Sequence, residues 1–216
     1  MKRFLGRLVG LLSVLAALAP ANADDTALRS ALADKTAQEH VLEAAKQTPA
    51  FAHDPCPSAT FSFTGRVAVY VTPERDPAGA LTKGAWKQQV HEEGCGHERL
   101  LNVLVAVQGP GRIGTMPLLP GGTRGDPQLQ RDGIRYAMIA TQVAAKDCKQ
   151  GYVEETEFAD QGDKAIQGGK SPPWREVWTV VACGRKAQVP MRFIPDATGT
   201  TIAADAAKFD PAEPGK

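Results

Sequence analysis

Side chains that could bind a soft or borderline metal gather in one part of the sequence: His53, His91, Cys95 and His97. Imidazole and thiolate groups brought to one point bind zinc or copper. A second stretch of the chain has the same layout around Cys183, but Thr179 and Arg185 stand there in place of the two later histidines. Only the cysteine recurs, and a disulfide would consume it. We therefore expect no metal site and no cofactor.

Glutamates supply the second candidate chemistry: Glu92, Glu93, Glu154, Glu155 and Glu157. Two carboxylates that flank a glycosidic bond are sufficient for hydrolysis. The same residues are also typical of the solvent-facing side of an antiparallel strand. The sequence has no Gly-x-Ser-x-Gly elbow, no phosphate-binding glycine loop that opens a helix and no HExxH motif. We assign no catalytic residue, and a hydrolase that uses strand carboxylates stays as the alternative function.

One combination of residues occurs twice in the chain. In each copy a tryptophan is followed nine residues later by Cys-Gly, then by an apolar run, and a glycine stands sixteen residues after the cysteine: Trp86, Cys95 and Gly111, then Trp174, Cys183 and Gly199. A helical segment and a further cysteine precede both copies. This shared order predicts an internal duplication.

The four cysteines are expected to form disulfides, as is usual in exported chains. Four cysteines allow three pairings, and the repeat selects Cys56 with Cys95 and Cys148 with Cys183. Each bond would stabilise the protein by about 4 kcal/mol in the chain-entropy model. A redox-active pair would need the Cys-x-x-Cys spacing, which this sequence lacks.

The three tryptophans allow two interpretations. Exposed tryptophans are frequent at binding hot spots, whereas a tryptophan on a strand beside a disulfide commonly belongs to the core. We expect Trp86 and Trp174, the repeated pair, to be buried. Trp178 shares a strand face with Trp174 because side chains alternate, so we expect it to be partly buried.

The first residues indicate export. Three basic residues precede an apolar run over 8–18, which is too short to span a bilayer. Small residues then predict a signal peptide over 1–23, cleaved between Ala23 and Asp24. The remaining chain has 22 Lys+Arg against 24 Asp+Glu. This near balance excludes nucleic acid as a partner, and we expect a periplasmic or secreted protein with no membrane span after cleavage.

The segments between these motifs show clear periodicities. Helical spacing predicts one or two helices over 24–48 and another over 127–146, the latter opened by Asp126 as a cap and Pro127. Alternating or apolar runs predict strands over 61–71, 86–92, 100–107, 112–116, 152–158, 174–182, 189–194 and 200–204. A loop is expected over 73–84. Pro190 lacks a ladder donor, which favours an edge strand, and residues 206–216 are expected to be a disordered tail.

Together these features predict an α+β fold built as a tandem repeat. Each module, over 24–121 and 122–205, would pack a helix on a roughly four-stranded antiparallel sheet and be held by one disulfide. In outline this resembles the secreted β-lactamase-inhibitory proteins, which also repeat a disulfide-held helix-and-sheet module and bind a partner across the sheet. The likeness covers architecture alone, matches no motif and transfers no function. The leading hypothesis is an exported, non-catalytic binding or inhibitory protein of the periplasm, whose partner is an unknown protein or small ligand.

Overall fold

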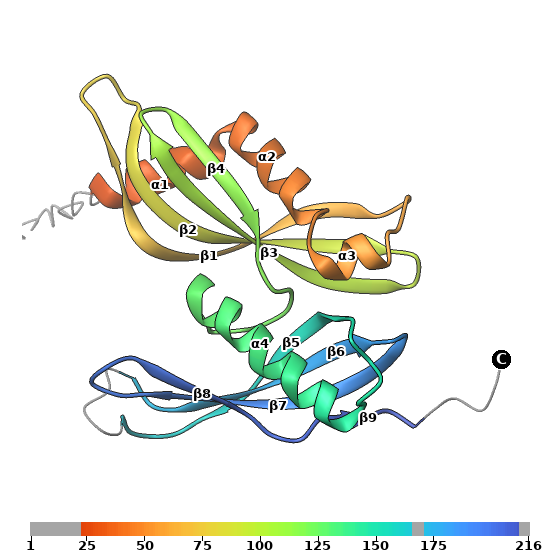
Figure 1. The fold of residues 1–216 in the computed structure, drawn as a ribbon. Coiled ribbons are helices and arrows are strands. Elements are labelled where there is room, and N and C mark those ends of the chain that lie inside the picture. The colour runs from red at the N-terminus through yellow and green to blue at the C-terminus, as the bar shows by residue number, and fades with distance from the viewer. Residues whose placement is uncertain (1–22, 166–170, 212–216) are drawn as a thin grey trace, which may run out of the picture.

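The computed structural model describes residues 23–165 and 171–211. The chain forms two antiparallel sheets, each with helices packed beside it (Figure 1). The first sheet has the strand order β1-β2-β3-β4, and the second has the order β5-β6-β7-β8, with β9 paired to β7. The expected signal peptide lies outside the described residues except for Ala23, where α1 begins.

The helices are α1 (Ala23–Ala33), α2 (Lys35–Ala45), α3 (Pro49–His53) and α4 (Pro127–Ala144). The first sheet consists of β1 (Thr60–Arg75), β2 (Leu81–Gly94), β3 (His97–Gly109) and β4 (Arg112–Pro117). The second consists of β5 (Gly151–Gln161), β6 (Trp174–Ala182), β7 (Arg185–Pro195), β8 (Thr200–Ala204) and β9 (Lys208–Phe209).

The helical segment before the first sheet is divided twice. Asp34 interrupts it because its carboxylate accepts a hydrogen bond from the Ala37 backbone N–H at 2.8 Å and so caps α2. Pro49 directly follows the helical segment predicted over 24–48, but the chain becomes helical again there. Pro49 opens the short helix α3, since a proline at the first helical position needs no hydrogen-bond donor.

The first hairpin is longer than expected. β1 continues to Arg75 and β2 begins at Leu81, so most of the predicted loop over 73–84 is strand. Strict alternation in β1 is also wrong. The register shift after Val69, which stands opposite Trp86, places Val71 opposite Ala85, so Val71 no longer shares a face with Trp86 and is exposed.

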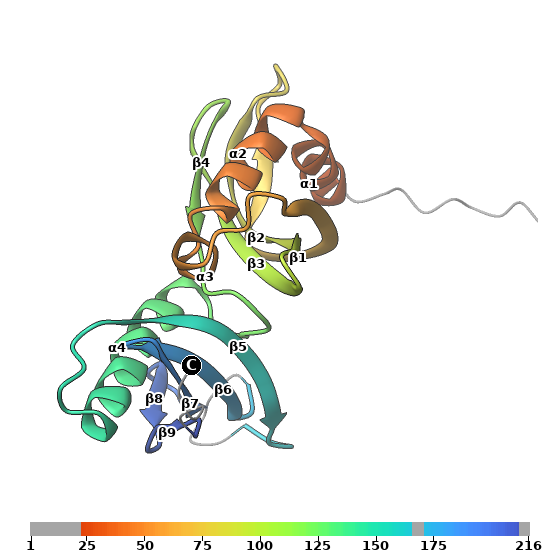
Figure 2. The same cartoon turned by 90° about the vertical axis from the view of Figure 1, so that its right-hand side faces the viewer.

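The second sheet is covered on one face by α4 (Figures 1 and 2). Asp126 caps this helix by accepting hydrogen bonds from two backbone N–H groups, each at 2.9 Å, and Pro127 follows it as predicted. Gly133 allows close packing on the sheet, because a Cβ there would lie 2.5 Å from the Trp178 ring. The helix therefore lies directly on the aromatic core of this sheet.

Two expectations for the C-terminal part are wrong. β7 is an interior strand. Along one side it pairs with β8 from Met191 onward and with β9 at residues 187–188. Pro190 falls in the gap between these two partners. No ladder donor is needed at that gap. Residues 208–209 form β9, and the Arg185 guanidinium lies 4.6 Å from the Phe209 ring centre, so the segment 206–216 begins with ordered chain. Residues 212–216 lie outside the described part.

Candidate functional site

The two disulfides occupy equivalent hairpin turns. Cys56 bonds Cys95 and Cys148 bonds Cys183, and in each bond the Cα atoms lie 5.8 Å apart. Both turns consist of Cys-Gly with φ positive at both residues, 50° and 82° in the first and 49° and 74° in the second. These angles are those of the two-residue turns that match strand twist. The Cys95 sulfur is therefore held in a bond and is not a thiolate ligand.

The three histidines that were considered as metal ligands do not meet. His91 and Glu92 are successive residues of β2 and point to opposite faces of the sheet. His97 lies on the Glu92 side, with its Nε2 atom 3.4 Å from the Glu92 carboxylate. His53, at the end of α3, stacks on the Tyr152 ring of β5 at a centroid distance of 4.1 Å. Within the described ranges no group of three or more His, Cys, Asp or Glu could hold a metal ion.

Glu92 does not lie on a solvent-exposed strand face. Its side chain is fully buried, and neither carboxylate oxygen has a hydrogen-bond partner. Besides the His97 imidazole, the nearest basic group is Arg99, whose Nη1 atom lies 3.6 Å away and whose Nη2 atom pairs with Asp54. Buried polar groups are almost always hydrogen-bonded, so Glu92 is an exception in this core.

The glutamates of β5 do lie at the surface. Glu154 forms an ion pair with Lys186, with a nitrogen–oxygen distance of 2.6 Å. Glu155 and Glu157 are exposed and share the sheet face opposite α4. Partial burial raises the pKa of the Glu155 carboxyl, and the charges of Glu157 and Glu154 raise it further. Their spacing gives two adjacent carboxylates on an open strand.

All three tryptophans are buried, so the aromatic-face interpretation is wrong. Trp174 and Trp178 share a polar partner that lies between them on β6. The Glu176 carboxylate accepts hydrogen bonds from the Trp174 indole at 2.8 Å, from the Trp178 indole at 2.7 Å and from the Arg124 backbone N–H at 2.8 Å. This fully buried carboxylate is thus held by three donors, one of them from the segment that joins the sheets.

That connecting segment, residues 118–126, is bonded to both sheets. On the first sheet, the Asn102 side chain donates to the Gly121 carbonyl at 3.0 Å and the Lys87 ammonium donates to the Thr123 carbonyl at 3.2 Å. Burial lowers the pKa of Lys87, and the Glu176 charge partly offsets this shift. On the second sheet, the Gly122 N–H donates to the Thr156 carbonyl at 2.6 Å. The segment therefore couples the two sheets through polar contacts.

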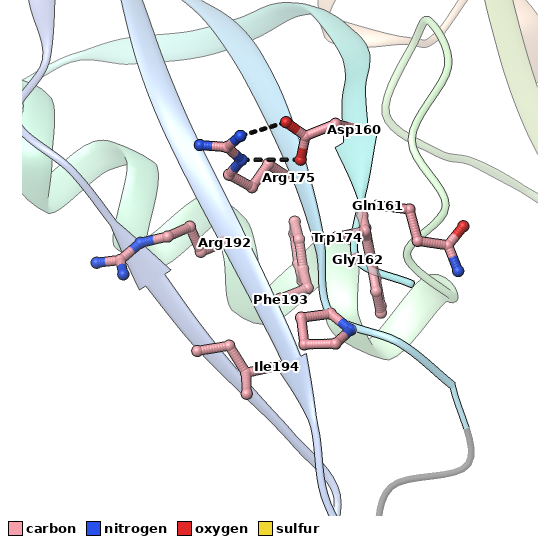
Figure 3. A pocket seen from close by; sticks show the side chains of 9 residues that line it. Asp160, Gln161, Gly162, Trp174, Arg175, Arg192, Phe193 and Ile194 are labelled. Atoms are coloured by element: carbon pink, nitrogen blue, oxygen red, sulfur yellow. Dashed lines mark hydrogen bonds and ion pairs between the residues drawn. The ribbon is translucent and has the colours of Figure 1, made fainter. Parts of the chain in front are cut away.

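A hollow opens at the end of the second sheet (Figure 3). Residues of β5, β6 and β7 and of the segment before β6 line it, among them Asp160, Pro173, Trp174, Arg175, Arg192 and Ile194. Trp174 lies flat on Phe193, with centroids 4.8 Å apart, and forms an aromatic wall. Among the described residues that line it, Asp160 is the single carboxylate, and it is already engaged by Arg175. The hollow therefore lacks the second carboxylate of a glycosidase.

Four charged residues cross the outer face of the second sheet in a row. Arg175 and Arg192 stand directly opposite each other on β6 and β7, with side chains 63% and 48% exposed. Asp160 pairs with Arg175 through two hydrogen bonds, which hold the pKa of Asp160 below its usual range. Asp205 pairs with Arg192 at 3.0 Å. Like charges opposed across strands are unfavourable, so an anionic group placed between the arginines would be attracted to both.

The sequence contained signals for the residues that were missed. Glu176 lies two positions from each of two tryptophans, so strand alternation places it on their buried face. Arg175 and Arg192 are equally distant from the Cys183-Gly184 turn, and a two-residue turn fixes the register of its hairpin. Only the second inference requires the hairpin turn to be located first.

Comparison with known proteins does not assign the chain to a family. No family model matches it, and no match is found among curated proteins or solved structures. Among the residues that the structure describes, no helix combines the length and apolarity needed to cross a bilayer. The function is therefore argued from the site itself.

Proposed function

We propose that the protein is an exported, non-catalytic binding or inhibitory protein of the periplasm. The N-terminal segment with its basic start, apolar run and small residues supports export. The two disulfides are compatible with an oxidising compartment outside the cytoplasm. They fix a rigid scaffold, and the outer face of the second sheet presents charged and half-buried apolar side chains on it.

Duplication of one module, giving units over 24–121 and 122–205, is part of this proposal. It is supported by the Cys-Gly turns, which have the same φ signs and lie between the second and third strands of each sheet. It is also supported by the buried tryptophan that stands nine residues before each of these turns, Trp86 and Trp174. A cross-link useful to a single ancestral module must close within it, as both bonds do.

The opposed pair Arg175 and Arg192 is the observation that carries the binding function. Both arginines line the hollow, whose apolar lining includes Pro173 and Ile194. This combination suits an acidic side chain or a chain carboxylate that is joined to an apolar group. Asp160 and Asp205 would hold the guanidinium groups in position before the partner arrives. The partner is therefore proposed to present a carboxylate to this end of the sheet.

Charge reversal tests this proposal directly. Immobilised protein would be exposed to periplasmic extract, and a retained partner would be identified by mass spectrometry. The affinity of that partner would then be measured for the purified wild type and for the double variant Arg175→Glu/Arg192→Glu. We expect a loss of at least about tenfold, which corresponds to roughly 1.4 kcal/mol. Arg66→Glu, an exposed change on β1, is the matched control and should bind normally. Equal affinity of the double variant would disprove the proposed surface.

The alternative is an envelope hydrolase that uses strand carboxylates. The observation that favours it is the pair Glu155 and Glu157, of which Glu155 has the raised pKa expected of a general acid. A panel of chromogenic glycosides and esters tests it. Turnover that Glu155→Gln abolishes and that Glu93→Gln preserves would support the hydrolase over the binding protein.

A further inference from the structure

The outer side of α4 carries an apolar stripe that the fold does not use. Among the described large hydrophobic residues, the three most exposed are Val143 at 70%, Ile139 at 58% and Tyr136 at 46%. They lie at positions i, i+3 and i+7 of one helix, so they share one face. We call these three residues the α4 stripe.

The stripe is opposite the side of α4 that packs on the sheet. Gly133, Ala137 and Thr141 are buried against the second sheet and follow the other face of the helix. In Figure 2, α4 lies at the side of the second sheet, and its far side faces away from both sheets. A partner could therefore reach the stripe without displacing any part of the fold. Three adjacent exposed apolar side chains are typical of an interaction surface.

Two charged residues of opposite sign flank the stripe, so the flanks of one copy complement those of a second copy that runs antiparallel to it. Asp132 stands seven residues before Ile139, and Lys146 stands seven residues after it, just beyond the end of α4 at Ala144. Asp132 lies about two helical turns, about 10 Å, before Ile139, and Lys146 lies in the turn that directly follows the helix, so opposite charges stand at the two ends of the stripe. If two copies pair about a twofold axis at Ile139, the Asp132 end of each helix lies beside the Lys146 end of the other copy. A parallel pair would bring like charges together.

We propose that the α4 stripe binds the stripe of a second copy of this chain and forms a twofold dimer. Ile139 of each copy lies on the axis, and the antiparallel helix dipoles are also favourably opposed. Asp132 accepts a hydrogen bond from Gln128 at 2.9 Å through one oxygen, which leaves the other oxygen for the lysine. One helix pair is a small interface, so the dimer is expected to be weak and concentration-dependent. This inference is independent of the binding function proposed above.

Sedimentation equilibrium tests the dimer between about 1 and 500 µM, because its population follows mass action. We expect wild type to shift from monomer to dimer across this range. Ile139→Asp should weaken association at least tenfold, whereas Val71→Asp, at an exposed apolar position on β1, should leave it unchanged. Thermal melts of both variants verify that they fold. A wild type that stays monomeric throughout, or a dimer that is unaffected by Ile139→Asp, would overturn the proposal.

Cross-linking and charge exchange test the register. Ile139→Cys should form a symmetric disulfide dimer under mild oxidation, and Val71→Cys should not, with peptide mapping to show that the native disulfides are intact. Asp132→Lys should weaken the dimer, and the double variant Asp132→Lys/Lys146→Asp should recover it. Failure of the double variant to recover, together with the absence of a cross-link in Ile139→Cys, would exclude this twofold arrangement even if a dimer forms.

Discussion

Each half of the molecule buries one glutamate completely, and the two are treated in opposite ways. Glu176 lies between two indole N–H groups and receives a third hydrogen bond from the Arg124 backbone. Glu92 has no hydrogen bond at either oxygen, with Arg99 and His97 only at 3.6 and 3.4 Å. The first carboxylate is held by hydrogen bonds within its core, and the second has basic side chains nearby but no hydrogen bond.

This difference shows that a buried charge alone does not define a site. A carboxylate satisfied by fixed donors organises the groups around it, and Glu176 thereby connects the aromatic core of the second sheet to the connecting segment. A carboxylate without hydrogen-bond donors is costly to bury. The basic groups near Glu92 are close to it but are not placed to donate hydrogen bonds. The comparison leads to three predictions about stability.

Replacing Glu176 should have the largest effect. In Glu176→Leu, the indole N–H groups of Trp174 and Trp178 and the backbone N–H of Arg124 lose their acceptor in the core. Each unsatisfied donor costs about 1–3 kcal/mol, and we expect a loss of about 4 kcal/mol in the free energy of unfolding, measured in urea. Glu157→Leu, on the exposed face of β5, is the control and should change it by less than about 0.5 kcal/mol. Similar results for both variants would contradict the role given to Glu176.

The connecting segment should have the second largest effect, because it delivers the third donor to Glu176. Gly121 has φ +86°, and a Cβ there would lie 2.2 Å from the Thr156 carbonyl oxygen. We expect Gly121→Ala to cost about 3 kcal/mol, from backbone strain together with displacement of the segment. Gly79, with φ +87° and open space around its Cβ position, is a matched control that isolates the strain, and Gly79→Ala should cost about 1 kcal/mol. Equal losses of stability in the two variants would mean that the connecting segment shifts away from the added Cβ at little energetic cost.

Much of the fold followed from local rules in the sequence. The cap Asp126 and Pro127 located the start of α4, and the repeated Trp-to-Cys spacing selected the disulfide pairs that the structure contains. The strand of residues 174–182 was predicted with the bounds that β6 has. These features depend on interactions between residues close in sequence, or on a spacing that occurs twice.

The features that were missed depend on contacts between distant segments. Glu92 is buried beside His97 and Arg99 of β3, and Asp54, which follows α3, pairs with that Arg99; no periodicity in β2 reveals this packing. Pro190 is tolerated inside a sheet because β8 ends and β9 begins opposite it. In β1, the register shift after Val69 leaves Val71 exposed although the alternation over 61–71 placed it on the inward face. Each outcome is decided by the partner segment and not by the residue itself.

The smallest effect is expected at Glu92. Glu92→Gln keeps the shape of the side chain and removes a charge that forms no hydrogen bond, while Arg99 keeps its ion pair with Asp54. The lost attraction to Arg99 and His97 is offset by the lower cost of burying a neutral group, so we expect a change within about 1 kcal/mol in either direction. Glu176→Gln should lower the free energy of unfolding by about 2 kcal/mol. The glutamine amide nitrogen is itself a donor, so one N–H group that now has an acceptor would face another donor. Urea unfolding of the two variants side by side measures this difference. An equal loss of stability at both positions would contradict it, because it would show that Glu92 is satisfied as fully as Glu176 is by the indoles.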